Sequence, residues 1–276
     1  APSARWRHLG RPLARVHGQR VLLSWSATMF EYLMPRLFLR HPERTLLLES
    51  CDAMLDQQIA FARRHAVPWG ISESAFGELG IQGDYQYRAF GVPGLGLKAD
   101  LGERLVVAPY ASLLALPLRP REAMANVTRL IELGALGRYG MIDAVDFGET
   151  ASRAAARATT GAATGSTALG RDRDAARHRP YLVRTYMAHH QGMILVAACN
   201  QLLGDRMVER LHAEPQVESV ELLLHERIPI DVPPPRRWRR PESAAAEPGA
   251  PAEGGVPAWA VDPRGGVDHA LPLSNG

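Results

Sequence analysis

Two glutamates stand alone in apolar segments, where a carboxyl group could act as an acid. Glu31 lies in the run TMFEYL, and Glu73 follows the segment PWGIS. Cleavage of a glycosidic bond needs an acid that protonates the leaving oxygen and a second carboxylate that acts as nucleophile or base. Burial raises the pKa of a carboxyl group, as a general acid requires. We therefore predict Glu31 and Glu73 as the catalytic pair, with Asp143 and Asp146 in GMIDAVDF as reserves. The alternative for each residue is a structural hydrogen bond or a helix cap.

Aromatic and polar side chains gather in glycine-rich stretches, which suits recognition of a sugar. Sugars present apolar CH faces and polar hydroxyl edges, so a glycan site combines aromatic rings with carboxylates, amides and arginines. The side chains predicted to bind substrate on this ground are Trp25, Trp69, Tyr85, Tyr87, Arg88, Tyr139, Asp146 and Tyr186, with Tyr110 as a further aromatic residue. The alternative for each ring is a place in the core.

The string YMAHHQGM places His189 and His190 next to each other, followed by Gln191. Adjacent residues on a helix point about 100° apart, whereas a helical two-histidine metal site needs a spacing of three or four. We therefore expect no metal, and we predict that His189, His190 or Gln191 binds a sugar hydroxyl while the remaining histidine is structural. No P-loop or GxSxG motif is present, so no nucleotide or other cofactor is expected.

The composition is that of a globular chain able to bury one sizeable core, with 276 residues, 46% hydrophobic and 22% charged. The net charge is only +3, and arginines concentrate at 171–179 and 236–240, so we interpret them as parts of flexible linkers and expect no nucleic-acid partner. Cys51 and Cys199 lack CxxC spacing and are predicted to be reduced core residues. No run approaches the roughly twenty apolar residues of a membrane helix.

Apolar residues at spacings of three and four predict helices, and no convincing pair of strands is seen. A first helix is expected from about Ser50, as its N-cap, to a point before Pro68. Further helices are predicted at 109–116, 121–133 and 181–203, and in DRMVERLHA and VESVELLLHER. Residues 69–98 are predicted to form long loops with short extended pieces. The expected fold is therefore all-α, with functional loops at one end of a toroid of helix pairs.

Two stretches lack the large apolar residues that a core needs. Residues 151–179 are rich in alanine, threonine, glycine and arginine and are predicted to form a flexible insertion. From Pro233 onward the chain is rich in proline and arginine. The predicted organisation is one domain at 1–230 followed by a linker at 231–276.

Six motifs, taken together, resemble a known family. They are LSWSATMFEYLMP, VPWGISESAF, YQYRAFGVPGLGLK, VVAPYASLLAL, GALGRYGMIDAVDF and RTYMAHHQGMILVA. In order and spacing they resemble the glycoamylase-like domain of cyclic β-1,2-glucan synthases, over about residues 10–229.

The resemblance implies a polytopic inner-membrane parent with a glycosyltransferase that uses UDP-glucose, this middle module of (α/α)6 type, and a phosphorylase-like region. The module is implied to cyclise linear β-1,2-glucan by transglycosylation with retention of the anomeric configuration. Its partners would be a β-1,2-glucan chain and the other domains of the parent. The segment itself would be soluble and lie on the cytoplasmic side of the bacterial inner membrane.

The ends of the chain also resemble parts of this parent. The string HALPLSNG resembles the opening of the phosphorylase-like region, and the first half of the toroid is expected to lie upstream of Ala1. One essential carboxylate could lie there too. The isolated fragment is therefore expected to be inactive.

One motif departs from the family pattern. Similar proteins read GFYEA where this chain reads GMIDA, so Asp143 stands in place of a glutamate. The shorter side chain weakens the expectation of a catalytic role at this position. The alternative function is a module that binds glycan without chemistry, as a binding or scaffold element of the synthase.

Overall fold

Short strands accompany the helices in the part of the chain that the structure describes. The computed structural model describes residues 9–81, 83–99, 101–102, 104–148 and 180–227, all within one compact unit, Ala1–Pro235. The predicted insertion at 151–179 and the linker at 231–276 lie outside these residues.

The helical elements are α2 (Met29–Leu33), η1 (Pro35–Leu37), α3 (Leu46–Arg64), α4 (Pro109–Leu114), α5 (Pro120–Glu132), α8 (Ala188–Leu203), α9 (Arg206–His212), α10 (Pro215–Glu218) and η2 (Glu221–His225). The strands are β1 (Leu13–Val16), β2 (Gln19–Leu22), β3 (Glu73–Leu79), β4 (Tyr85–Ala89), β5 (Val106–Val107), β6 (Leu136–Gly137), β7 (Gly140–Met141), β8 (Ala144–Asp146) and β9 (Tyr181–Val183).

The predicted all-α class is not confirmed, because the described residues also form small antiparallel sheets. Three of these are the pairs β1–β2, β3–β4 and β6–β7, and one is three-stranded in the order β5–β8–β9. The extended pieces expected within residues 69–98 pair as the β3–β4 hairpin, in which Glu73 lies opposite Ala89 and Ala75 opposite Tyr87. Strands of two or three residues are too short to show an alternating pattern in the sequence.

Helix α3 begins earlier than predicted and ends where expected, before Pro68. Its N-cap is Thr45 rather than Ser50. Ser50 lies inside the helix, where its hydroxyl accepts the backbone N–H of Leu22 at 2.9 Å and so ties α3 to strand β2. One side of α3 faces the core, where the side chains of Met54 and Leu55 are fully buried.

Helix α8 ends at the predicted place but begins seven residues later. Gly204 closes it with φ 67°, the left-handed conformation that favours glycine after a helix. The first predicted turn is instead strand β9, because Tyr181–Val183 finds backbone partners along the buried strand β8. The predicted helices at 109–116 and 121–133 are confirmed as α4 and α5, with boundaries shifted by one or two residues.

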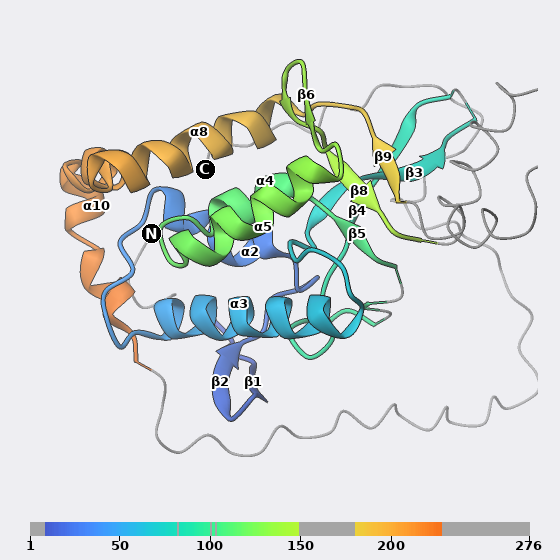
Figure 1. Ribbon diagram of the computed structural model, residues 1–276. Helices are drawn as coiled ribbons and strands as arrows, with labels where there is room; N and C mark the ends of the chain where they lie inside the picture. Colours follow the sequence, from blue (N-terminus) through green and yellow to red (C-terminus); the bar gives the residue numbers. More distant parts are fainter. Residues whose placement is uncertain (1–8, 82, 100, 103, 149–179, 228–276) are drawn as a thin grey trace, which may run out of the picture. The chain divides into compact units, whose positions relative to one another are not determined.

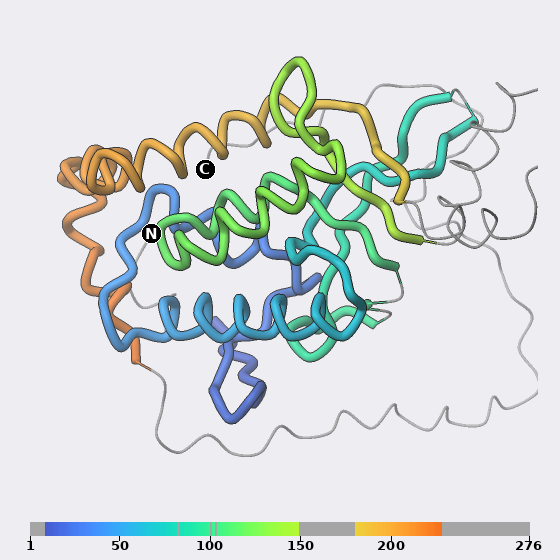
Figure 2. Tube along the Cα trace, viewed as in Figure 1, coloured from blue at the N-terminus to red at the C-terminus, as the bar shows by residue number. Residues whose placement is uncertain are grey.

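The helices form a connected layer around one main core. Helix α2 contacts α3 and α4, and α4 in turn contacts α5 and α8. Figures 1 and 2 show the β3–β4 hairpin and the three-stranded sheet at the same end of these helices. The largest fully buried apolar side chains are Tyr110, Met29, Leu33, Leu37, Met54, Leu55, Ile71, Leu95, Leu114, Leu130 and Ile142.

Two buried amide side chains hold the segment that leads into β3. The side chain of Gln58, on α3, donates to the carbonyl of Ile71 at 2.9 Å and accepts its N–H at 3.0 Å. The side chain of Asn126, on α5, donates to the carbonyl of Trp69 at 2.7 Å and accepts its N–H at 3.1 Å. Between them, Gly70 adopts φ 124°, and a Cβ there would lie 2.9 Å from Ser112 Oγ, so only glycine fits.

Within the described residues, no helix is both long enough and apolar enough to cross a membrane.

We predict that Asn126→Ala lowers the free energy of unfolding by about 2 to 4 kcal/mol, because it leaves the buried N–H of Trp69 without its partner and opens a small cavity. Urea unfolding of the chain measures the change. Met124→Ala, at a half-exposed position on the same helix, is the control and should cost under about 0.5 kcal/mol. Equal small losses in both variants would contradict the role given to Asn126.

Candidate functional site

The carboxylate of Glu31 is held in a tight set of hydrogen bonds at the start of α2. It accepts the hydroxyl of Ser24 at 2.7 Å, the N–H of Ser26 at 3.0 Å and the N–H of Thr28 at 3.1 Å. The hydroxyl of Thr28 accepts the N–H of Glu31, which completes a capping box. The sequence carries this signal, since a threonine three residues before a glutamate is the pattern of the box. Glu31 therefore has a structural task, whatever else it does.

Glu73 is the contrasting case, because no described residue forms a hydrogen bond with its carboxylate. The side chain is half-buried at the first position of β3. Burial raises the pKa of Glu73, and the negative charge of Glu31 raises it further, against a smaller opposing effect of His190. The two predicted carboxylates therefore lie close enough for the charge of Glu31 to raise the pKa of Glu73.

The loop before Glu73 is also tied to α2 and α4. The hydroxyl of Ser72 accepts the N–H of Phe30 at 3.0 Å and lies 3.0 Å from the hydroxyl of Tyr110. The Tyr110 hydroxyl also donates to the carbonyl of Glu73 at 3.1 Å. Tyr110 was predicted as an aromatic residue of the site, and its ring is buried beneath it.

A chain of hydrogen bonds runs from the core to the surface beside Glu73. Asp143 is buried, and its carboxylate accepts the N–H of Ala75 at 2.6 Å and lies 2.6 Å from Nδ1 of His190. Nε2 of His190 lies 3.3 Å from the hydroxyl of Tyr87. The His190 ring stacks on Tyr110, with ring centroids 3.7 Å apart.

The pairing of β3 with β4 decides which side chains share this surface. Residues opposite each other in an antiparallel pair lie on one face, and neighbours along a strand alternate. Glu73, Ala75, Tyr87 and Ala89 therefore lie on one face, while Arg88, which pairs with Ser74, lies on the other. In agreement, the charge of Glu73 contributes to a raised pKa of Tyr87, after the larger effect of burial.

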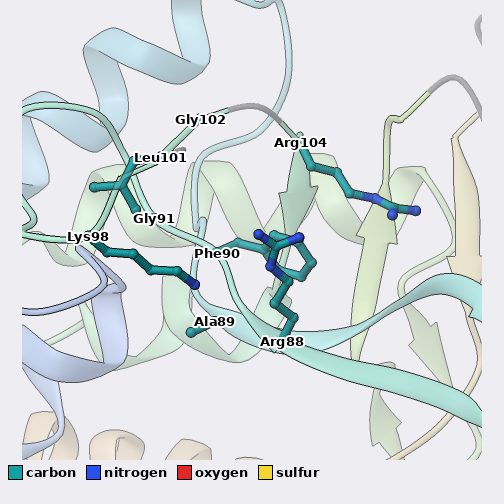
Figure 3. Close-up of a pocket in the computed structure, with 8 residues that line it drawn as sticks. All are labelled: Arg88, Ala89, Phe90, Gly91, Lys98, Leu101, Gly102 and Arg104. Atoms are coloured by element: carbon teal, nitrogen blue, oxygen red, sulfur yellow. The ribbon is translucent and has the colours of Figure 1, made fainter. Parts of the chain in front are cut away.

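The opposite face of the hairpin has its own small basic pocket. Arg88 and Lys98 project into it, and the guanidinium of Arg104 turns away (Figure 3). Arg104 is bound to Glu78 at 2.7 Å and to Asp146 at 3.0 Å. The structure therefore does not bring Arg88, predicted to bind substrate, together with Glu73.

Two of the residues predicted to bind substrate have buried side chains with structural partners, and these predictions are corrected. Trp69 is only 5% exposed and packs in the core, so its ring offers no platform to a sugar. Asp146 is fully buried, where its carboxylate accepts Arg104 and the N–H groups of Gly77 and Gly148. Both side chains stabilise the frame of the site rather than its surface.

The other predicted residues lie at or near the surface. Trp25 is 66% exposed and stands between Ser24 and Ser26, the two residues that bind Glu31. His189 is exposed beside His190, with ring centroids 4.2 Å apart. Exposed Tyr139 packs edge-on against Tyr186. The side chain of Gln191 donates to the carbonyl of Met141 at 2.8 Å. The hydroxyl of Tyr85 lies 3.1 Å from that of Tyr181.

The sequence alone did not reveal the partnership of Asp143 with His190. The two residues are 47 positions apart, and nothing in either segment signals the other. Within the described residues, no group of three or more histidine, cysteine, aspartate or glutamate side chains could hold a metal ion.

The chain is similar in sequence to one large enzyme. It is 41% identical over 242 residues to the cyclic β-(1,2)-glucan synthase NdvB of Rhizobium meliloti (strain 1021). The match covers 88% of this chain and 8% of that protein, so the chain spans only a small part of its relative.

Solved structures show the same fold at low identity. An endo-β-1,2-glucanase from Chitinophaga pinensis, in complex with sophorotriose and glucose, matches with a TM-score of 0.52 and 16% identity, over 78% of this chain and 46% of that one. A β-1,2-glucanase from Parabacteroides distasonis matches with a TM-score of 0.51 and 15% identity, over 76% of this chain and 26% of that one. The family profile of the glycoamylases, described as "putative glucoamylase", matches residues 2–213. The chain therefore belongs to the glycoamylase family.

Proposed function

We propose that this chain is the β-1,2-glucan-acting module of a cyclic β-1,2-glucan synthase and supplies part of an (α/α)6 toroid. The 41% identity with such a synthase over 88% of the chain supports this, as does the fold shared with two β-1,2-glucanases. The module would close a linear glucan into a ring by transglycosylation with retention. Its partners would be the glucan chain and the other domains of a polytopic parent, on the cytoplasmic side of the inner membrane.

The observation that carries the proposal is the state of Glu73. Its carboxyl group is half-buried, lacks a hydrogen-bond partner among the described residues and has a raised pKa. A general acid must hold its proton near the operating pH and must be free to give it to the leaving oxygen. We assign Glu73 this role.

Glu31 is the second carboxylate of the proposal. Retention takes two displacement steps and requires a nucleophile opposite the acid. The hydrogen bonds from Ser24, Ser26 and Thr28 occupy both carboxylate oxygens of Glu31, and they favour a second account in which Glu31 holds the turn and raises the pKa of Glu73. In that account a carboxylate from another part of the parent completes the pair.

The surface around Glu73 has the features of a glycan site. Tyr87 and His190 lie beside it, His189 lies next to His190, and exposed Trp25 stands on the turn that Glu31 closes. Aromatic rings pack on the CH faces of sugars, and the polar groups take hydroxyl hydrogen bonds. Tyr85, Tyr139, Tyr186 and Gln191 are proposed as more distant contacts along the glucan chain.

A module that binds glycan without chemistry is the second candidate. The capping box favours this candidate, because a carboxylate that only caps a helix takes no part in catalysis. A glycan-binding isotherm with no change in product size on long incubation would support this candidate.

In the full-length synthase, Glu73→Gln is expected to lower ring formation at least about 100-fold, because the amide cannot donate the acid proton. Linear glucan should accumulate, and mass spectrometry separates it from the ring because a ring lacks one water. Glu78→Gln, at an exposed position of the same strand, is the matched control and should keep wild-type yield. Normal ring yield in Glu73→Gln would remove Glu73 from catalysis.

Glu31→Gln distinguishes the two roles of Glu31. The amide NH2 group would face the N–H donors of the turn, so we expect a stability loss of about 1 to 2 kcal/mol in urea unfolding. If Glu31 is only a cap and a charged neighbour, ring yield should fall much less than in Glu73→Gln. An equal fall, at preserved folding, would make Glu31 a direct participant.

The raised pKa of Glu73 also predicts how stability depends on pH. The folded protein holds this proton more tightly than the unfolded chain, so its contribution to stability is fully present below the unfolded pKa of glutamate and is lost as pH rises through the folded value. Glu73→Gln should therefore be more stable than wild type at neutral pH, and the difference should shrink on acidification below about pH 4.3. Thermal unfolding of the chain at several pH values measures it; a variant less stable at neutral pH would contradict the raised pKa.

A further inference from the structure

We propose that Asp143, acting through His190, sets the hydroxyl oxygen of Tyr87 as a hydrogen-bond acceptor for one sugar hydroxyl, and so determines which hydroxyl of the glucan is recognised. The inference rests on the proposed function, because it takes the sugar as the ligand of this surface. Asp143 and His190 are positioning residues here, and Tyr87 makes the contact.

The direction of each hydrogen bond follows from the chemistry of the groups. An ionised carboxylate only accepts, so the 2.6 Å contact with Asp143 places the proton of His190 on Nδ1. The proposal takes the imidazole as neutral, so that Nε2 carries a lone pair and the hydroxyl of Tyr87, 3.3 Å away, donates to it. The remaining lone pairs of the Tyr87 oxygen are left to accept from a ligand.

Burial separates the members of this chain into an interior and a surface part. Asp143 and His190 are 2% and 1% exposed, so water does not compete for their hydrogen bond. Tyr87 is 43% exposed and is the member that a ligand can reach. Stacking on Tyr110 restricts the His190 ring, which keeps Nε2 aimed at the tyrosine.

Tyr87 must keep its phenolic proton in order to donate a hydrogen bond to His190. Burial, followed by the negative charges of Glu73 and Asp143, raises the pKa of Tyr87. The protonated phenol donates inward to His190, and it therefore cannot donate outward at the same time.

The second hydrogen bond of Asp143 provides a sharp test. One carboxylate oxygen accepts the N–H of Ala75 at 2.6 Å, and the other accepts His190. In Asp143→Asn the Ala75 N–H holds the amide oxygen, so the NH2 group must face His190 and donate to Nδ1. The imidazole proton then moves to Nε2 and points at the Tyr87 oxygen. The Tyr87 proton turns outward, and Tyr87 changes from acceptor to donor with almost no change in shape.

The first measurement is ¹⁵N NMR of the histidines in the isolated chain, with His190 assigned by His190→Gln. Wild type should carry the His190 proton on Nδ1, and Asp143→Asn should carry it on Nε2. A wild-type proton on Nε2, or the same tautomer in both proteins, would overturn the inference. This measurement needs no glucan.

The second measurement is calorimetric binding of sophorotriose and its singly deoxyfluorinated derivatives to the full-length protein, because fluorine cannot donate a hydrogen bond. In wild type one derivative should bind about tenfold more weakly than sophorotriose, the effect of one lost hydrogen bond. Asp143→Asn and Tyr87→Phe should lose this discrimination. Tyr181→Phe, which removes a phenol whose hydroxyl lies 3.1 Å from that of Tyr85, should keep it.

The outcomes separate this inference from the proposed function. If the wild type binds sophorotriose and Asp143→Asn discriminates among the derivatives as the wild type does, the inference is wrong and the proposed function still stands. No binding of sophorotriose by wild type rejects the proposed function, and with it a sugar as the ligand of Tyr87.

Discussion

The site depends on two buried amides that form hydrogen bonds with the backbone of the segment before Glu73. Gln58 and Asn126 each form a donor and an acceptor hydrogen bond with one backbone residue, on the two sides of Gly70. A buried backbone group without a hydrogen-bond partner costs about 1 to 3 kcal/mol of folding free energy. These hydrogen bonds therefore fix the path of the chain. They tie the segment that leads into β3 to both α3 and α5, which lie in different parts of the sequence.

Once β3 is fixed, the pairing with β4 divides the hairpin into two surfaces of different chemistry. One face carries Glu73 and Tyr87, next to the first turn of α8, and the other carries Arg88. The carboxyl group of Glu73 is kept partly dehydrated and near the charge of Glu31, an arrangement that costs stability at neutral pH. Such a cost is typical of catalytic groups, and it distinguishes Glu73 from Asp143 and Asp146, whose charges are satisfied by close partners.

Local patterns in the sequence predicted the features that depend on residues close together in the chain. The helix at 121–133, the left-handed Gly204 after α8 and the apolar stripe of α3 all follow from spacing and capping rules. The capping box of Glu31 was available in the sequence as the structural alternative. The family resemblance rested on six sequence motifs, and the family itself is established by the matches reported above.

What the sequence could not show depends on contacts between distant segments. Strand β9 forms because β8 offers it backbone partners, which overrides the helical pattern of residues 181–183. Trp69 is buried in a core that distant segments form, and Tyr87 and Arg88 point to opposite faces because neighbours alternate along strand β4, whose pairing with β3 no local pattern predicted. The pairing of Asp143 with His190 joins two motifs that had suggested, separately, a carboxylate with a weakened catalytic role and two histidines of which one was expected to be structural.

The claim that one face of the β3–β4 hairpin is the glycan surface can be tested most directly by aromatic ¹H–¹³C NMR of the protein titrated with sophorotriose. Tyr87 and His190 report on that face, and Phe90, which lies with Arg88 at the basic pocket, reports on the opposite one. The account predicts shifts of the Tyr87 and His190 signals that saturate with the sugar, while Phe90 stays unchanged. Shifts at Phe90 with Tyr87 and His190 unchanged would contradict it.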